Sequence, residues 1–381
     1  MQGSGERQKL EVIDVLRGIA ILSVFGYHWH ISQVDRYVQH NGRVMMFQDV
    51  TWDNLYASFS PLNYGSYGVE LFLVISGFLI HYNYLIRGAG RLNLNHYFSR
   101  RFWRIYPPYI LVLFFFAFLN KERSAYHLFT ETGRESLLCH LLMVHNLYGD
   151  NAIIFGINSS FWSIALEIQL YLIYPIFLIL RRKIGVYKLC FTLFIVHVLA
   201  LIGIYIWRSG FPHSLAEVTF VGHFWIIWGL GAMVAEAWFA RQKIFKISWT
   251  GWFILFLIFM SSQIFLLFFV YAGSIMSAIL WAALIELCLY QPLRLNVFFR
   301  YVKSFLIPVG LCSYSIYLIH QPLIEPLLQH VNWGDSSRYT SLINIGWVFS
   351  VIFLISYSMY VFVEQPSIRF GQKIAGTSRA K

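Results

Sequence analysis

The chain has 381 residues, of which 58% are hydrophobic and only 12% are charged. A soluble globular domain carries roughly 25% charged residues, so this composition argues against an ordinary soluble enzyme and is typical of a protein that spans a lipid bilayer. The net charge of +11 does not indicate a nucleic-acid partner, because the basic residues are concentrated between the hydrophobic stretches.

Hydropathy along the chain predicts ten membrane-spanning helices, each long enough to cross the hydrocarbon core. They cover residues 13–31, 67–86, 103–120, 161–180, 187–207, 219–240, 251–271, 273–290, 307–327 and 341–363. The sequence therefore predicts an all-α polytopic membrane protein. We expect a single transmembrane domain over 1–370 and a short basic tail over 371–381.

The placement of the 29 Lys and Arg residues predicts the orientation of these spans. All but seven lie in the terminal segments, near the start of the first span, or in the even-numbered connections. The seven on the opposite side are Arg36, Arg43, Lys121, Arg123, Arg134, Arg208 and Arg338. Because positively charged loops remain in the cytoplasm, we expect both termini inside. We also expect the first span to be retained, since Arg17 interrupts it and no small-residue cleavage site follows.

The first span contains two ionisable residues, Arg17 and His28. Such groups are costly at membrane depth and usually mark a pathway or an active site. Eleven residues separate them, close to three helical turns, so they share one helix face about 16 Å apart. Asp14, three residues before Arg17, is placed to neutralise the guanidinium. This pattern indicates chemistry within the membrane.

Further polar residues are predicted at a similar depth in other spans. Glu167 in the fourth span lies within about 5 Å of the depth of His28, counted at 1.5 Å per residue. His320 lies in the outer half of the ninth span with Tyr314 below it, and Glu70 lies at the outer mouth of the second. Which of these spans are neighbours is left open by the sequence.

Other features are interpreted as structural. Glu236 and Glu286 lie near the inner ends of spans, where they can be solvated. The four cysteines show neither metal-ligand spacing nor a disulfide pattern, so we expect no metal site. The outer segments 32–66 and 121–160 are rich in aromatic residues and Asn, which suits a lid or acceptor platform. Within the second, the apolar stretch 136–148 is too short to span and predicts an interfacial or re-entrant helix.

Six segments, in this order, resemble the integral-membrane acyltransferase family three, which O-acylates glycans. They are IDVLRGIAILSVFGYHWH at 13–30, YGVELFLVISGFLI at 67–80, RRFWRIYPPY at 100–109, FWSIALEIQLYLIYP at 161–175, CSYSIYLIHQPL at 312–323 and VEQPSIRF at 363–370. The resemblance runs from about Val12 to Phe370. It is to the form without the extracytoplasmic hydrolase-like domain that some relatives carry.

The resemblance implies an acyl-CoA donor in the cytoplasm and an acceptor hydroxyl presented from outside. It also implies functional roles for Arg17 and His28, and for Arg101 and Arg104 before the third span. We interpret His28 as the general base, because imidazole titrates near neutrality. Arg101 and Arg104 suit the phosphates of CoA, although basic residues are also expected in any cytoplasmic loop.

The remaining candidate residues have supporting roles in this interpretation. Glu167 is expected either to orient His28 or to form a structural hydrogen bond with Tyr171 or Trp162. Arg17 is expected to hold the polar arm of the donor or the Asp14 pair. Acceptor-side or supporting roles are assigned to the following residues: Asp14, Glu70, Trp162, Ser163, Tyr314 and His320.

The predicted function is transfer of an acyl group, expected to be acetyl, to a cell-surface or lipid-linked glycan in a bacterial inner membrane. A macrolide or another small hydroxylated acceptor is an alternative substrate. No activated Ser or Cys is evident, so direct transfer is favoured over a covalent intermediate. A proton-coupled transporter using the same buried charges is the alternative function, although the chain shows no related halves. A catalytically inactive assembly partner is a third hypothesis.

Overall fold

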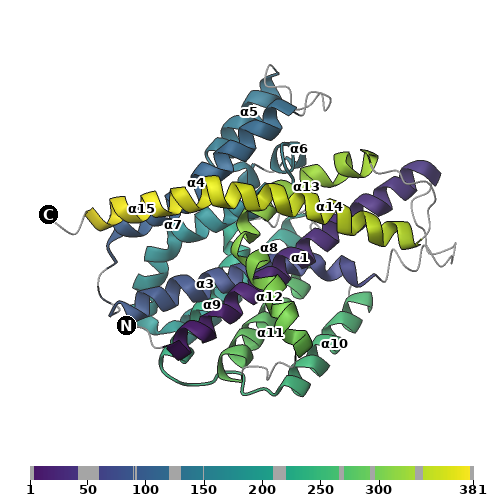
Figure 1. Ribbon diagram of the computed structural model, residues 1–381. Coiled ribbons are helices and arrows are strands. Elements are labelled where there is room, and N and C mark those ends of the chain that lie inside the picture. The colour runs from purple at the N-terminus through teal and green to yellow at the C-terminus, as the bar shows by residue number, and fades with distance from the viewer. Residues whose placement is uncertain are drawn as a thin grey trace. The chain divides into compact units, whose positions relative to one another are not determined.

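A computed structural model describes residues 4–41, 60–88, 90, 92–119, 130–148, 150–208, 220–265, 270–291, 297–330 and 338–377. Its regular elements are all helices, and no strand occurs among the described residues (Figure 1). This confirms the all-helical part of the predicted fold. Parts of the predicted outer segments, residues 42–59 and 120–129, lie outside the described residues, as does the end of the predicted tail at 378–381.

Seven helical segments within the described residues are long and apolar enough to cross a membrane. They are Glu11–Gln33, Pro61–Ile86, Leu94–Leu119, Phe161–Ile184, Val186–Gly203, Gly273–Tyr290 and Ile343–Gly376. An eighth is reached if the bent pair Arg300–Leu311 and Ser313–Gln329 counts as one span. The remaining two predicted spans, at 219–240 and 251–271, correspond to the helices α9 (Val221–Phe239) and α10 (Trp249–Phe265). The protein is therefore treated below as a membrane protein, and the number of ten spans stays a prediction.

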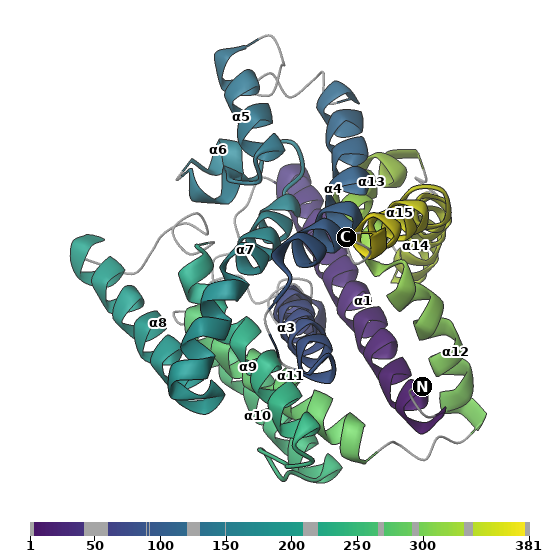
Figure 2. The same ribbon diagram turned by 90° about the vertical axis from the view of Figure 1, so that its left-hand side faces the viewer.

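The helices divide into two units, Met1–Phe72 with Ile244–Ser356, and Leu73–Lys243 with Tyr357–Lys381. The first unit is built on the long helix α1 (Ser4–Asn41), which packs against α12, α13, α11 and η1. Figure 2 shows α1 and α12 running side by side. The other elements of this unit are η1 (Pro61–Tyr67), α10, α11 (Val270–Tyr290), α12 (Val297–Leu311), α13 (Ser313–His330) and most of α14 (Arg338–Met359).

A sharp bend separates α12 from α13. The two helix axes differ by 79°, and the break falls at Cys312, just after Pro308. The thiol of Cys312 donates to the carbonyl oxygen of Pro308 at 3.0 Å, so the bend leaves that acceptor satisfied within an apolar setting. The bend places Ser313 at the start of a new helix, where its side chain reaches α1.

The second unit contains most of α3 (Gly68–Ile86), together with α4 (Leu94–Leu119), α5 (Glu131–Leu141), η3 (His145–Leu147), α6 (Asn151–Ile154), α7 (Phe161–Ile184), α8 (Val186–Arg208), α9, the π-helical segment η5 (Tyr360–Glu364) and α15 (Gln365–Thr377). In this unit α15 packs along α4, and α8 packs against α9 and α7. Figure 1 shows α15, in yellow, lying along α4. The domain boundary predicted at residue 370 falls inside α15.

The backbones of α3 and α9 make a close approach through two glycines. A Cβ atom placed on Gly231 would lie 1.9 Å from the carbonyl oxygen of Val74, and one placed on Gly77 would lie 2.0 Å from that of Trp228. Small residues at helix interfaces allow this kind of approach inside membranes. The consequence is that side chains one turn further along α3 and α9 can meet directly.

The predicted interfacial stretch 136–148 is divided in the structure. Thr130 caps α5 by accepting from the Gly133 N–H at 3.0 Å. The helix ends at Leu141, and Met143 adopts a positive φ of 53° before η3 begins. The hydroxyl of Tyr109 on α4 donates to the carbonyl of His140 at 3.0 Å. This segment is therefore fixed to α4 as a short helix followed by a turn.

Candidate functional site

The first unit brings Arg17, Asp14 and Ser313 together. Arg17 Nη1 lies 3.5 Å from Asp14 Oδ1, so the predicted ion pair is present. Arg17 Nη2 also donates to Ser313 Oγ at 3.0 Å. The Arg17 side chain is only 13% exposed, and these contacts satisfy a charge that apolar surroundings disfavour. Arg17 is thus tied to the start of α13, a contact that the sequence did not indicate.

His28 lies beside a second histidine from α13. The ring centroids of His28 and His320 are 5.1 Å apart. His320 is fully buried, and its Nδ1 lies 3.2 Å from the carbonyl oxygen of Ile316 and 2.9 Å from that of Tyr317. Because a carbonyl can only accept, Nδ1 carries the hydrogen and Nε2 presents a lone pair. That Nε2 has no hydrogen-bond partner among the described residues, so the pair offers a basic nitrogen that can accept a substrate proton.

Glu70 is a buried acid of the same unit. Its side chain is near the start of α3, and its Oε1 accepts from Ser274 Oγ at 2.7 Å. Its Oε2 has no hydrogen-bond partner among the described residues. The preceding turn is fixed by Trp281, whose Nε1 donates to the Tyr67 carbonyl at 3.0 Å. An oxygen held in this way can accept a hydrogen bond from a substrate hydroxyl. Tyr314, the other predicted acceptor-side residue of this unit, is partly buried on α13.

Glu167 lies on α7 in the second unit. It accepts a hydrogen bond from the hydroxyl of Tyr171, one turn later. A phenol has a single hydrogen, so Ser76 Oγ is the donor in its 3.1 Å contact with the Tyr171 oxygen. The result is a directed chain of hydrogen bonds from Ser76 through Tyr171 to Glu167. The structural contact predicted with Tyr171 is present, whereas the pairing of Glu167 with His28 stays a prediction.

Trp162 and Ser163 occupy the first turn of α7. The ring of Trp162 contacts that of Phe224 at 5.7 Å between centroids. Ser163 Oγ donates to the carbonyl of Ser160 at 3.2 Å. These contacts anchor the start of the helix that carries Glu167, and a direct role for the two residues in binding an acceptor stays a prediction.

A basic cavity lies among the described residues of the second unit. Its volume is about 360 Å³, within the range of small-molecule pockets of roughly 300–1,000 Å³. The guanidinium-bearing residues of its wall are Arg87, Arg100, Arg101 and Arg104. The other polar residues of its wall are His96, Asn83, Asn93, Gln372 and four tyrosines, and none of the described residues that line it carries a carboxylate. Like charges gathered at one cavity disfavour one another unless an anion joins them, so the cavity is suited to a ligand with several negative charges.

Aromatic rings hold one of these arginines in place. The guanidinium carbon of Arg101 lies 4.3 Å from the ring centroid of Tyr97, a cation–π contact. The Tyr97 hydroxyl in turn donates to the Tyr171 carbonyl at 3.2 Å. Both tyrosines line the cavity. Arg101 and Arg104, which the sequence identified, therefore share one cavity with Arg87 and Arg100, which it treated only as loop charges.

Glu286 is buried, so the interpretation that water can solvate it was wrong, whereas the Glu236 side chain is partly exposed and also bonded to protein groups. Glu236 accepts from Arg181 at 2.5 Å and from His81 at 2.9 Å. Glu286 is buried and accepts from the backbone N–H groups of Ile244, Phe245 and Lys246 at 2.6, 3.0 and 3.3 Å. Both acids are satisfied by partners distant in sequence. His81, like Arg17, is an ionisable group inside an apolar span, and this feature of the sequence could have identified it.

A family profile described as "Acyltransferase domain" matches residues 10–362. A protein of Haemophilus influenzae, named only as an uncharacterized protein, is 31% identical over 123 residues, which are 30% of this chain and 50% of the relative. The acyltransferase MdmB of Streptomyces mycarofaciens is 27% identical over 125 residues, 33% of this chain and 31% of that protein. The aligned regions thus span half or less of these relatives. No solved structure shows significant similarity to the chain.

Proposed function

Because the chain belongs to acyltransferase family three, as the match over residues 10–362 shows, we propose that it is a membrane O-acyltransferase that uses acyl-CoA. The donor acyl group is acetyl in this proposal, and the acceptor is a hydroxyl of a cell-surface or lipid-linked glycan. The protein would work in a bacterial cytoplasmic membrane, crossing it ten times with both termini in the cytoplasm. The resemblance to the family and the distribution of basic residues support these finer points.

The observation that carries the proposal is the basic cavity. Among the described residues, four arginines and no carboxylate line it, and the donor class proposed here carries several phosphate charges. Arginine is well suited to phosphate because its planar guanidinium can form two parallel hydrogen bonds. The connection that supplies Arg87 and Arg100 is also the one that charge distribution predicts to be cytoplasmic, where acyl-CoA is available.

The proposed chemistry is direct transfer. A basic imidazole nitrogen of His28 or of its neighbour His320 takes the proton of the acceptor hydroxyl. The resulting alkoxide attacks the thioester carbonyl, the carbon–sulfur bond breaks, and the CoA thiolate leaves and takes up a proton. The products are the O-acyl ester and free CoA. Glu167 and Glu70 are assigned supporting roles, as carboxylates that stabilise the imidazolium or bind the acceptor.

Turnover of acetyl-CoA by the purified protein tests this proposal. The wild type is expected to bind CoA and to release free CoA, slowly without acceptor and faster with it. His28→Ala should abolish release while CoA binding persists, and Arg104→Ala should weaken CoA binding. The matched controls are His197→Ala and Arg369→Ala, because these residues lie outside the cavity wall and the histidine pair. A wild-type protein that neither binds nor cleaves the thioester would contradict the proposal and favour the transporter.

A further inference from the structure

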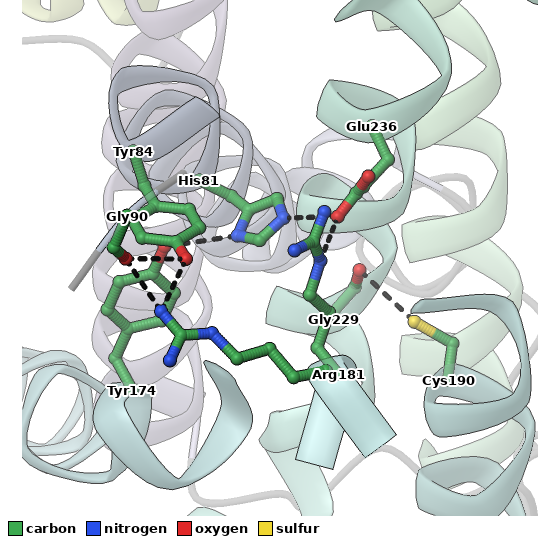
Figure 3. Close-up of polar contacts among 9 residues, drawn as sticks. His81, Tyr84, Gly90, Tyr174, Arg181, Cys190, Gly229 and Glu236 are labelled. Carbon is green, nitrogen blue, oxygen red and sulfur yellow. Dashed lines mark hydrogen bonds and ion pairs between the residues drawn. The ribbon is translucent and has the colours of Figure 1, made fainter. Parts of the chain in front are cut away.

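A chain of buried polar groups runs behind the basic cavity. His81 on α3 is fully buried and lies between two partners from other helices. Its Nε2 is 2.9 Å from Glu236 Oε1 on α9, and its Nδ1 is 3.0 Å from the hydroxyl oxygen of Tyr174 on α7. Arg181 Nε donates to the same Glu236 oxygen at 2.5 Å. Figure 3 shows these side chains converging from three helices.

The chemistry of the partners fixes the direction of the hydrogen bonds. The ionised Glu236 carboxylate, paired with Arg181, can only accept, so His81 Nε2 carries a hydrogen and donates it. In a neutral imidazole the other nitrogen is then an acceptor, and the Tyr174 hydroxyl donates to it. His81 therefore has one tautomer and one ring orientation in this setting, and the Tyr174 hydroxyl has one rotamer.

From Tyr174 the chain continues into the cavity wall. The Tyr174 ring packs on that of Tyr97 at 5.4 Å and an interplanar angle of 31°. Tyr97 lies beneath the guanidinium of Arg101. All three residues line the cavity, whereas His81 and Glu236 do not. The order of contacts is thus Glu236, His81, Tyr174, Tyr97 and Arg101.

A second arginine at the end of α7 fixes the rim of the same cavity. Arg182 Nη2 donates to the Tyr84 hydroxyl at 3.0 Å and to the Gly90 carbonyl at 2.6 Å. Tyr84 and Gly90 both line the cavity, and Tyr84 meets Tyr174 edge-on at 6.4 Å. Arg181 is therefore linked to the cavity wall through Glu236 and His81, whereas Arg182 bonds directly to residues of that wall.

We infer that His81 and Glu236 are positioning residues of the basic cavity, which orient the Tyr174–Tyr97 wall and through it the anion-binding Arg101. A purely structural role is the competing explanation. A largely buried ionic cluster such as Arg181, Glu236 and His81 is poor evidence for stability, because hydrophobic residues of similar volume often stabilise a protein as well or better. This cluster leads to the cavity wall, and its presence is better explained by the geometry that it imposes on that wall. The inference rests on the proposed function only for the identity of the ligand.

The experiment compares two buried histidines of the second unit. His81→Phe removes both hydrogen bonds and keeps a ring, and His81→Gln restores a donor and an acceptor. His197→Phe is the control, since His197 is a buried histidine that contacts the His223 carbonyl at 3.1 Å and lies outside the cavity wall. Affinity for CoA and for inorganic pyrophosphate is measured by calorimetry, with the unfolding temperature of each variant recorded.

His81→Phe is expected to weaken CoA and pyrophosphate binding at least about tenfold, a change of ~1.4 kcal/mol, and to raise KM for acetyl-CoA more than it lowers kcat. His81→Gln should recover most of the affinity, and His197→Phe should retain it. If folded His81→Phe binds both probes like the wild type, the inference is overturned. If His81→Phe does not fold, Glu236→Gln replaces it, with the same loss of affinity expected and wild-type affinity again overturning the inference.

The two probes separate this inference from the proposed function. Wild-type protein that binds pyrophosphate but not CoA would contradict the CoA donor, while loss of pyrophosphate binding in His81→Phe would still support the positioning role. Wild-type protein that binds neither probe would overturn both.

Discussion

The close approach of α3 and α9 makes Gly231 a sensitive position at which to test their packing. A Cβ atom at Gly231 would lie 1.9 Å from the Val74 carbonyl oxygen, a backbone atom that cannot rotate away. For the new Cβ to lie even 3.0 Å from the Val74 oxygen, the two helices must separate by about 1.1 Å. Overpacking of this kind costs ~1–3 kcal/mol. The same displacement would stretch the 2.9 Å bond between His81 and Glu236 to about 4 Å, beyond hydrogen-bond range.

We therefore expect Gly231→Ala to lose about 2.5–6 kcal/mol of stability, the sum of ~1–3 kcal/mol for overpacking and ~1.5–3 kcal/mol for a lost charged hydrogen bond. Donor binding should fall with it. Gly229→Ala is the matched control on the same helix, because its nearest neighbour would be Cys190 Sγ at 3.4 Å, an ordinary contact. Thermal unfolding in detergent, followed by tryptophan fluorescence, compares the two. Equal unfolding temperatures for both variants would refute the reasoning.

Three further outcomes are expected. His320→Ala should reduce transfer about a hundredfold or more, the scale of a lost general base, with CoA affinity unchanged; transfer within threefold of wild type would contradict this. Tyr97→Leu, which removes the ring beneath Arg101, should raise the Kd for CoA about two- to thirtyfold, from ~0.5–2 kcal/mol of cation–π energy, and an unchanged Kd in calorimetry would count against it. Burial lowers the pKa of His140 from 6.5 to about 4, so the unfolded chain binds more protons between these values and stability should fall by ~3 kcal/mol as pH drops from 6.5 to 4. His140→Phe should reduce that loss in pH-dependent melting curves, and an identical pH profile would exclude His140 as its source.

The helical fold and several local pairs could be predicted because they depend on short-range pattern. Apolar stretches of sufficient length define the helices, and the i,i+3 spacing of Asp14 and Arg17 was enough to predict their ion pair. The bond between Glu167 and Tyr171 follows from the same kind of spacing, one turn of helix.

Contacts between distant helices could not be predicted in this way. His81 and Glu236 are 155 residues apart, and their contact depends on two glycines that let the α3 and α9 backbones approach. His28 and His320 meet because α12 and α13 are bent at Cys312, and no periodicity in one sequence specifies that angle. The burial of Glu286 was missed for this reason: its depth was inferred, but its neighbours were not.

The ion pair of Arg181 also affects how membrane orientation should be measured. Topology is commonly tested by removing positive charges from a connection and asking whether the protein inserts the other way round. Removing Arg181 would also leave Glu236 without its cationic partner, a destabilising change for a partly buried carboxylate. A misfolded product could then be mistaken for an inverted one. Lys183, two residues further along α7 and exposed, carries the same charge and is the better position at which to begin such mapping.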